Sequence, residues 1–69
     1  MAKYFFHVTG KTAAEDDEGQ EFATPQAAAE EARLAAREIA RNYSEQEMRN
    51  STVRVVDEGG SEVARFTIF

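Results

Sequence analysis

An alanine-rich run in the middle of the chain constrains the fold more than any other feature. Residues 25–43 read PQAAAEEARLAAREIARNY, and most of these residue types favour helix. Thr24 can cap this helix with its hydroxyl, and Pro25 suits the first helical position, where no amide hydrogen is needed. At about 100° per residue, one stripe is predicted to face the core: Ala28, Ala32, Ala35, Ala36, Ile39 and Tyr43.

The segment before this helix is predicted to form two strands. Residues 3–9 (KYFFHVT) are rich in aromatic and β-branched side chains, and Gly10 ends the run. Polar and glycine turn signals follow, and residues 20–23 are predicted as a short second strand. We expect these two strands to pair as a loose hairpin.

The segment after the helix is predicted to form a second hairpin. Residues 52–56 and 62–68 have the pattern of strands, and residues 57–61 contain the glycines that a tight turn requires. The polar link at 44–51 either extends the helix or forms a turn. The order β-β-α-β-β predicts an α+β fold: a single antiparallel sheet of about four strands with one helix packed on one face. Residues 1–69 are expected to form a single small α+β domain.

Side-chain alternation divides the strands into a covered and an uncovered face, because one helix can cover only one face of a sheet. The predicted core face holds Tyr4, Phe6, Val8, Val53, Val55, Ala64, Phe66 and Ile68. The predicted uncovered face holds Phe5, His7, Arg54, Val56, Arg65, Thr67 and Phe69. We expect Phe6 and Phe66 at the centre of the core, with Ile39 beneath them.

The predicted uncovered face is more apolar than a solvated sheet face needs to be. Phe5, Val56 and Phe69 are predicted to form an exposed cluster with His7 at its side. The candidate interaction surface therefore consists of Phe5, His7, Val56 and Phe69. Pairing of such patches about a two-fold axis predicts a homodimer, with contact to another protein as the alternative.

Composition narrows the classes of partner and site. The net charge is −5, with 13 acidic residues against 8 Lys and Arg, which argues against binding by phosphate neutralisation. The chain has no cysteine, so disulfides and thiolate metal ligands are excluded. No apolar run approaches the roughly 18 residues of a membrane span. We expect a soluble, cytoplasmic protein without a membrane or nucleic-acid partner.

Three features of the sequence are candidates for chemical sites. His7 has no second histidine or cysteine to join it, so we expect a sheet-face histidine packed beside Phe5 rather than a metal ligand. The acids of EDDEG at 15–19 are consecutive, whereas a calcium loop alternates its ligands, so this segment is predicted to be a solvated acidic turn. Arginines at 33, 37 and 41 are interleaved with glutamates, which favours a solvated helix face over a phosphate or acidic-partner site.

Enzymatic and RNA-binding functions have less support in the sequence. The serines lie in no nucleophile motif, and the aromatic first strand lacks the glycine–aromatic pattern of RNA-binding sheets. We therefore expect a non-enzymatic protein with no catalytic residues, no metal and no cofactor.

Several motifs in combination resemble a known family. These motifs are KYFFHVTG, the acidic turn DDEGQEF, the helix ATPQAAAEEARLAAREIA and the closing VRVVDEGGSEVARFTIF. They resemble a family of short bacterial proteins that share a domain of unknown function, and the resemblance covers nearly the whole chain. It implies the order of elements above and brings no activity with it.

A weaker resemblance suggests a different function. An aromatic strand, an acidic glycine turn and an alanine-rich helix are similar to HicB-type antitoxins, although the usual Pro-Asp-Leu-Pro-Gly segment before the helix is missing. That resemblance implies a partial ribonuclease-H-like fold that masks a small toxin. Our first hypothesis is a protein-interaction domain that self-associates through its uncovered sheet face; the alternative is a HicB-like antitoxin or nucleic-acid-associated regulator.

Overall fold

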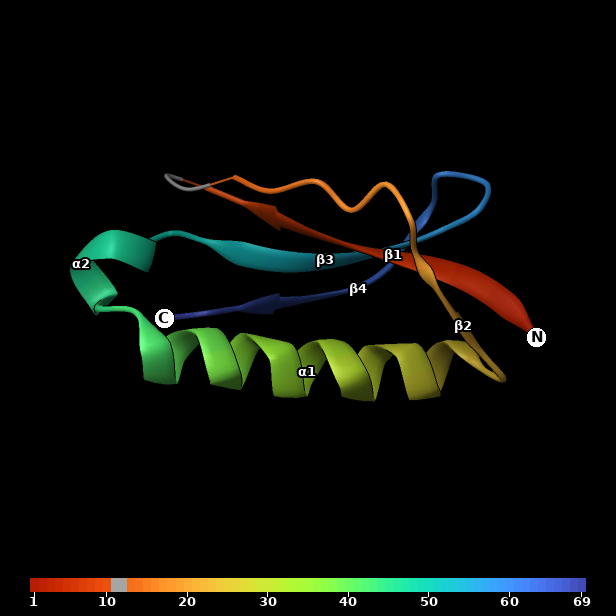
Figure 1. Cartoon of the computed structure of the whole chain (residues 1–69), viewed down its shortest axis with the longest axis horizontal. Coiled ribbons are helices and arrows are strands. Elements are labelled where there is room, and N and C mark those ends of the chain that lie inside the picture. The colour runs from red at the N-terminus through yellow and green to blue at the C-terminus, as the bar shows by residue number, and fades with distance from the viewer. Residues whose placement is uncertain (11–12) are drawn as a thin grey trace.

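A four-stranded sheet with one long helix against one face makes up the protein in the computed structural model (Figure 1). The structure describes residues 1–10 and 13–69. Its elements are β1 (Ala2–Thr9), β2 (Gln20–Phe22), α1 (Pro25–Asn42), α2 (Glu45–Met48), β3 (Thr52–Asp57) and β4 (Glu62–Thr67). The strand order is β2-β1-β3-β4 and each neighbouring pair is antiparallel. The predicted α+β fold class is therefore confirmed.

Helix α1 begins and ends close to where the sequence predicts. The Thr24 hydroxyl accepts a hydrogen bond from the Ala27 amide at 3.1 Å, and Pro25 occupies the first turn. Its buried side chains are Ala28, Ala32 and Ala36, which repeat every four residues and face the sheet. The prediction was wrong for Tyr43, which is 51% exposed, because the backbone turns to an extended conformation there and leaves the helical stripe.

The centre of the core is built from small side chains rather than from phenylalanines. Val53 and Val55 of β3 are fully buried with Ala28 and Ala32 of α1. Around them lie the other buried members of the cluster: Tyr4, Ala36, Met48 and Ile68. Alanine methyl groups let α1 lie close on β3 and β4, so little depth remains between the two layers.

The predicted central position of Phe6 and Phe66 is therefore wrong. Both are only partly buried and pack at the margin of the core, as Ile39 does. Phe6 instead stacks on Phe22 of β2, with ring centroids 5.8 Å apart. Tyr4 also contacts Phe22, at 6.2 Å between centroids. A three-residue aromatic group thus fills the core beside β1 and β2, where contacts with α1 are few.

The link between α1 and β3 forms a separate one-turn helix, α2, rather than an extension of α1. Ser44 and Glu47 make a reciprocal capping box: the serine hydroxyl accepts from the Glu47 amide, and the Glu47 carboxylate accepts from the Ser44 amide. This turn directs Met48 into the core, where it is 4% exposed. The pattern Ser-x-x-Glu at residues 44–47 is the sequence signature of such a capping box.

The predicted turn at residues 57–61 is confirmed. The Asp57 amide donates to the Ser61 carbonyl at 2.9 Å, and the Asp57 carboxylate accepts from the Gly59 and Ser61 amides. Gly60 has φ 88°, the left-handed conformation that favours glycine. The turn joins β3 to β4, which forms one edge of the sheet.

The close approach of α1 predicts a sharp size limit at Ala32. Ala32→Leu should destabilise the fold by about 1–3 kcal/mol, because a fully buried methyl site has no room for an isobutyl group. Ala27→Leu, on the exposed side of the same helix, should change stability by less than about 0.5 kcal/mol. Urea denaturation of both variants measures the difference, and equal stability would contradict the packing described here.

Candidate interaction surface

Cross-strand pairing arranges the sheet face opposite α1, here called the open face, in three rows. Across β1, β3 and β4 the rows are Phe5–Val56–Glu62, His7–Arg54–Arg65 and Thr9–Thr52–Thr67. The first row is mainly apolar, the second carries two guanidinium groups and an imidazole, and the third carries hydroxyl groups. The rows contain Phe5, His7, Arg54, Val56, Arg65 and Thr67, which the sequence predicts for this face, and add the polar residues Thr9, Thr52 and Glu62.

Glu62 reaches the open face because β4 contains a β-bulge. Val55 pairs with Ala64, but the next residue, Val56, pairs with Glu62, so one extra residue is inserted in β4. Strict alternation from Ala64 would place Glu62 on the core face. The bulge instead sets its carboxylate beside Arg54 and Arg65.

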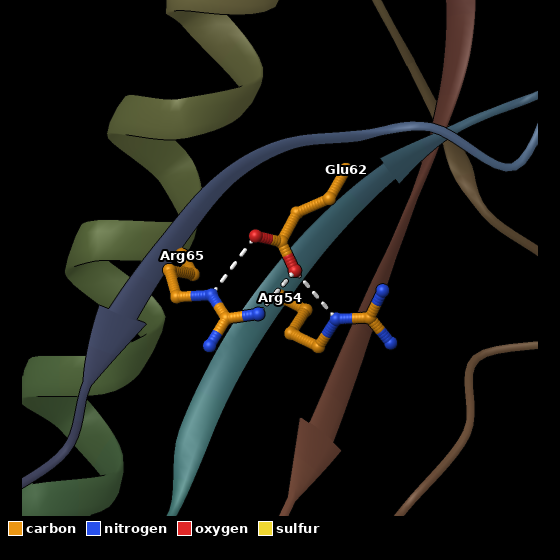
Figure 2. A network of polar contacts seen from close by, with 3 residues as sticks. All are labelled: Arg54, Glu62 and Arg65. Atoms are coloured by element: carbon orange, nitrogen blue, oxygen red, sulfur yellow. Dashed lines mark hydrogen bonds and ion pairs between the residues drawn. The ribbon is translucent and has the colours of Figure 1, made fainter.

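The Glu62 carboxylate lies between two guanidinium groups on the open face (Figure 2). Arg54 donates from Nε to Oε1 at 2.7 Å. Arg65 makes two hydrogen bonds of 2.9 Å, from Nε to Oε2 and from Nη2 to Oε1. The hydrogen bonds from Arg65 and then from Arg54 lower the pKa of Glu62 to about 2. Two cations share one anion, so this network carries a net positive charge.

Asp16 fastens the segment between β1 and β2 to the outer edge of β1. Its Oδ2 accepts from the Phe6 amide at 3.2 Å, and its Oδ1 accepts from the Gly19 and Glu18 amides at 3.0 and 3.1 Å. The Asp16 amide donates to His7 Nδ1 at 3.1 Å. A carboxylate that accepts three amide hydrogens is stabilised in its charged form, and the Gly19 hydrogen bond is the largest cause of the lowered pKa of Asp16.

The hydrogen bond to His7 assigns a structural role to its ring. Because Nδ1 accepts, the neutral imidazole carries its hydrogen on Nε2. The ring stacks nearly parallel to Phe5, with an interplanar angle of 5° and centroids 6.4 Å apart. His7 therefore packs beside Phe5, as the sequence predicts. It also anchors residues 15–19, here called the acidic segment, and this second role was not predicted from the sequence.

Gly19 allows the acidic segment to close on β1. Its φ is 72°, and a Cβ atom added there would lie 2.8 Å from Phe5 Cε2. Figure 1 shows the segment that precedes β2 crossing the side of the sheet away from α1. Phe5 is therefore half-buried beneath part of its own chain.

The four predicted surface residues do not form one patch. Phe5 and Val56 are cross-strand partners and His7 lies in the next row, but Val56 is only 8% exposed. Phe69 is 47% exposed and lies beyond Thr67, the partner of Thr52, at the other end of the strands from Val56. At about 3.3 Å per residue, Phe69 and Val56 are separated by roughly 20 Å. The structure brings three of the predicted residues together and leaves Phe69 apart.

Metal-ion binding and membrane insertion are two further properties that the arrangement of side chains bears on. Within residues 1–10 and 13–69, no group of three or more His, Cys, Asp or Glu side chains is placed to hold a metal ion. No helix in the same part of the chain has the length and apolar character needed to cross a membrane.

The fold and the surface define a small α+β domain with one face of its sheet under a helix and a polar, ion-paired open face. Comparison with protein families matches residues 3–69 to a domain of unknown function, DUF6894. The chain belongs to this family, in agreement with the resemblance of its motifs. The similarity to HicB-type antitoxins finds no support in the comparisons. Neither the curated proteins nor the solved structures contain a match to the chain.

The Asp16 contacts predict a local effect on stability. Asp16→Ala should destabilise the fold by about 1–2 kcal/mol, since three amide groups lose a charged acceptor. Asp17→Ala removes the same charge from an exposed neighbour and should cost less than about 0.5 kcal/mol. Denaturation of the two variants at neutral pH measures this contrast.

The pH dependence of the Asp16 contribution follows from the direction of its pKa shift. The folded state lowers the pKa, so the stabilisation is complete above the unfolded value of about 4 and is lost as the pH falls through the folded value. The difference between wild type and Asp16→Ala should therefore shrink upon acidification below about pH 4. A difference that stays constant to lower pH would contradict this assignment.

The ion network predicts a measurable titration. Arg65→Gln should raise the pKa of Glu62 from about 2, because it removes the donor that contributes most to the shift. Carbon-13 NMR of the side-chain carboxyl groups would follow the titration. Arg41→Gln, which affects the separate Arg41–Glu38 pair on α1, should leave the Glu62 titration unchanged.

Proposed function

We propose that this protein is a non-enzymatic interaction domain that forms a homodimer through its open face. The observation that carries this proposal is the separation of charge across that face. The Arg54–Glu62–Arg65 network makes the β3–β4 side positive, whereas the exposed acids Glu15, Asp17 and Glu18 lie along the outer edge of β1.

A non-enzymatic role is supported by how the polar groups of this face are used. Glu62 accepts from both arginines, and His7 Nδ1 is occupied by the Asp16 amide. Asp16 in turn accepts from backbone amides. These groups hold the face in shape, so we assign them to recognition rather than to catalysis.

A two-fold axis parallel to the strands would make the face complementary to itself. Such an axis exchanges the β1 side and the β4 side while it keeps the position along the strands. The acidic segment is level with the His7–Arg54–Arg65 row, because Asp16 bonds to Phe6 and His7. Two facing sheets would therefore set the acids of each copy against the arginines of the other.

The size of the face indicates a weak and reversible dimer. The backbone spans only 36 × 18 × 16 Å, so one face offers no more than about the 800 Å² per partner of a standard interface. Dissociation constants in the micromolar range are expected for such an area. The cytoplasmic location expected from the sequence stays a prediction.

A charge exchange tests the homodimer without altering Phe5, which also supports the acidic segment. Arg65→Glu and Asp17→Arg should each leave the protein monomeric in light scattering at about 100 micromolar, since each replaces two attractions by repulsions. An equal mixture of the two variants should recover the dimer, because every contact in the mixed dimer again pairs opposite charges.

Matched controls separate association from folding. Arg41→Glu changes the charge by the same amount on the outer side of α1 and should dimerise like the parent. Thermal unfolding of each variant checks that the protomer remains folded. A monomeric parent, or a mixture that stays monomeric, would overturn the proposed dimer.

A further inference from the structure

A second surface lies on the other side of the molecule, between α1 and β4. It is a groove of about 390 Å³, with Arg33, Ala36, Arg37 and Ala40 on the helix and residues 65–68 on the strand. The helix residues follow the spacing i, i+3, i+4, i+7, so they form one stripe of α1. Ala36 and Ala40 present only methyl groups, which leaves space beside the partly buried Phe66.

The charge of this groove is opposite to that of the whole protein. It is lined by Arg33, Arg37 and Arg65, of which Arg65 directs its guanidinium to Glu62 on the open face, and no acidic side chain from the described part of the chain lines it. Arg33 is held by Glu30 and Arg65 by Glu62, both outside the lining. Arg37 makes no hydrogen bond or close ion pair within residues 1–10 and 13–69, so its guanidinium is available to a ligand.

The groove borders an unpaired strand edge. β4 is the last strand in the order β2-β1-β3-β4, so one side of its backbone faces no other strand of the described residues. Amide and carbonyl groups of about every second residue point outward from such an edge. These groups can form hydrogen bonds with the backbone amides and carbonyls of an extended peptide. A nucleic acid has no backbone with the same alternation of donors and acceptors.

We infer that β4 and this groove bind an extended acidic segment of another protein, which adds to the sheet as a fifth strand. Side chains alternate along such a segment. Those on the helix side enter the groove, where their methylene groups lie beside Ala36, Ala40 and Phe66 and their carboxylates reach Arg37, which suits glutamate. Those on the open side lie beside Arg65, whose guanidinium is already bonded to Glu62, and suit apolar residues. The recognised pattern is therefore an alternation of apolar and acidic residues.

This inference does not rest on the proposed homodimer, although Arg65 borders both surfaces. Arg37 lies on α1, on the opposite side of the sheet from Arg54 and the acidic segment. Occupation of the groove leaves the centre of the open face uncovered. A failure of one proposal therefore leaves the other intact.

The probe is a capped peptide of about eight residues that alternates valine and glutamate, titrated into isotope-labelled protein and followed by NMR. We expect chemical-shift changes at the backbone amides of residues 63–68 and at the Arg37 side chain. Arg37→Glu should weaken binding by about tenfold or more, because it replaces attraction by repulsion at the rim. Arg41→Glu carries the same charge change one turn further along α1 and should alter affinity by less than about twofold.

Three additional probes define the outcomes that would overturn the inference. Equal binding of a valine–lysine peptide would exclude charge recognition at Arg37. Equal binding of the valine–glutamate peptide with methylated backbone nitrogens would exclude strand addition, because methylation removes the donors. Tighter binding of an oligothymidylate of similar length would assign the groove to a nucleic acid instead.

Discussion

The close contact between the alanine stripe of α1 and the valines of β3 is the constraint on which the rest of the structure depends. Ala28 and Ala32 pack in one cluster with Val53 and Val55, and none of the four is more than 1% exposed. Because the helix lies so near the sheet, large side chains are excluded from the centre. Phe6 and Phe22 therefore gather beside β1 and β2, and Phe66 is left half-covered at the β4 margin. The groove beside β4 is a direct consequence of this packing, since alanine methyl groups do not fill the space next to Phe66.

The second consequence is an open sheet face that has to be stable in water without a helix above it. Two sets of interactions stabilise the open face in water. The Arg54–Glu62–Arg65 network neutralises part of the charge that two adjacent arginines would otherwise bring together across β3 and β4. The segment before β2 covers Phe5 and satisfies backbone groups along β1 through Asp16 and through the paired hydrogen bonds between Val8 and Ala14. Both sets of interactions leave charged groups at defined positions, which is why the open face can serve for recognition.

Much of the fold is predictable from local sequence signals. Thr24 and Pro25 define the start of α1 because a cap and a first-turn proline act within one turn of helix. The alternation in residues 3–9 and 52–56 places Phe5, His7, Arg54 and Val56 on one face, and the structure agrees. The candidate surface was less predictable. Its members Phe5, His7 and Val56 do lie next to one another. Alternation in the sequence predicts which face a side chain is on but not how far along the strands it lies, so it could not show that Phe69 is at the other end of the sheet.

The sequence by itself therefore determined which segments are helix and strand, where their caps and the glycine turn lie, and which side chains share a face within one strand. These properties follow from interactions between residues a few positions apart. Only the tertiary structure decided the bulge that turns Glu62 towards Arg54, the hydrogen bonds that join Asp16 to Phe6 and His7, and the groove between α1 and β4. Each of these depends on the register of strands or on the distance between layers. Register and layer distance are set by the packing of the whole core, so no single stretch of sequence contains them.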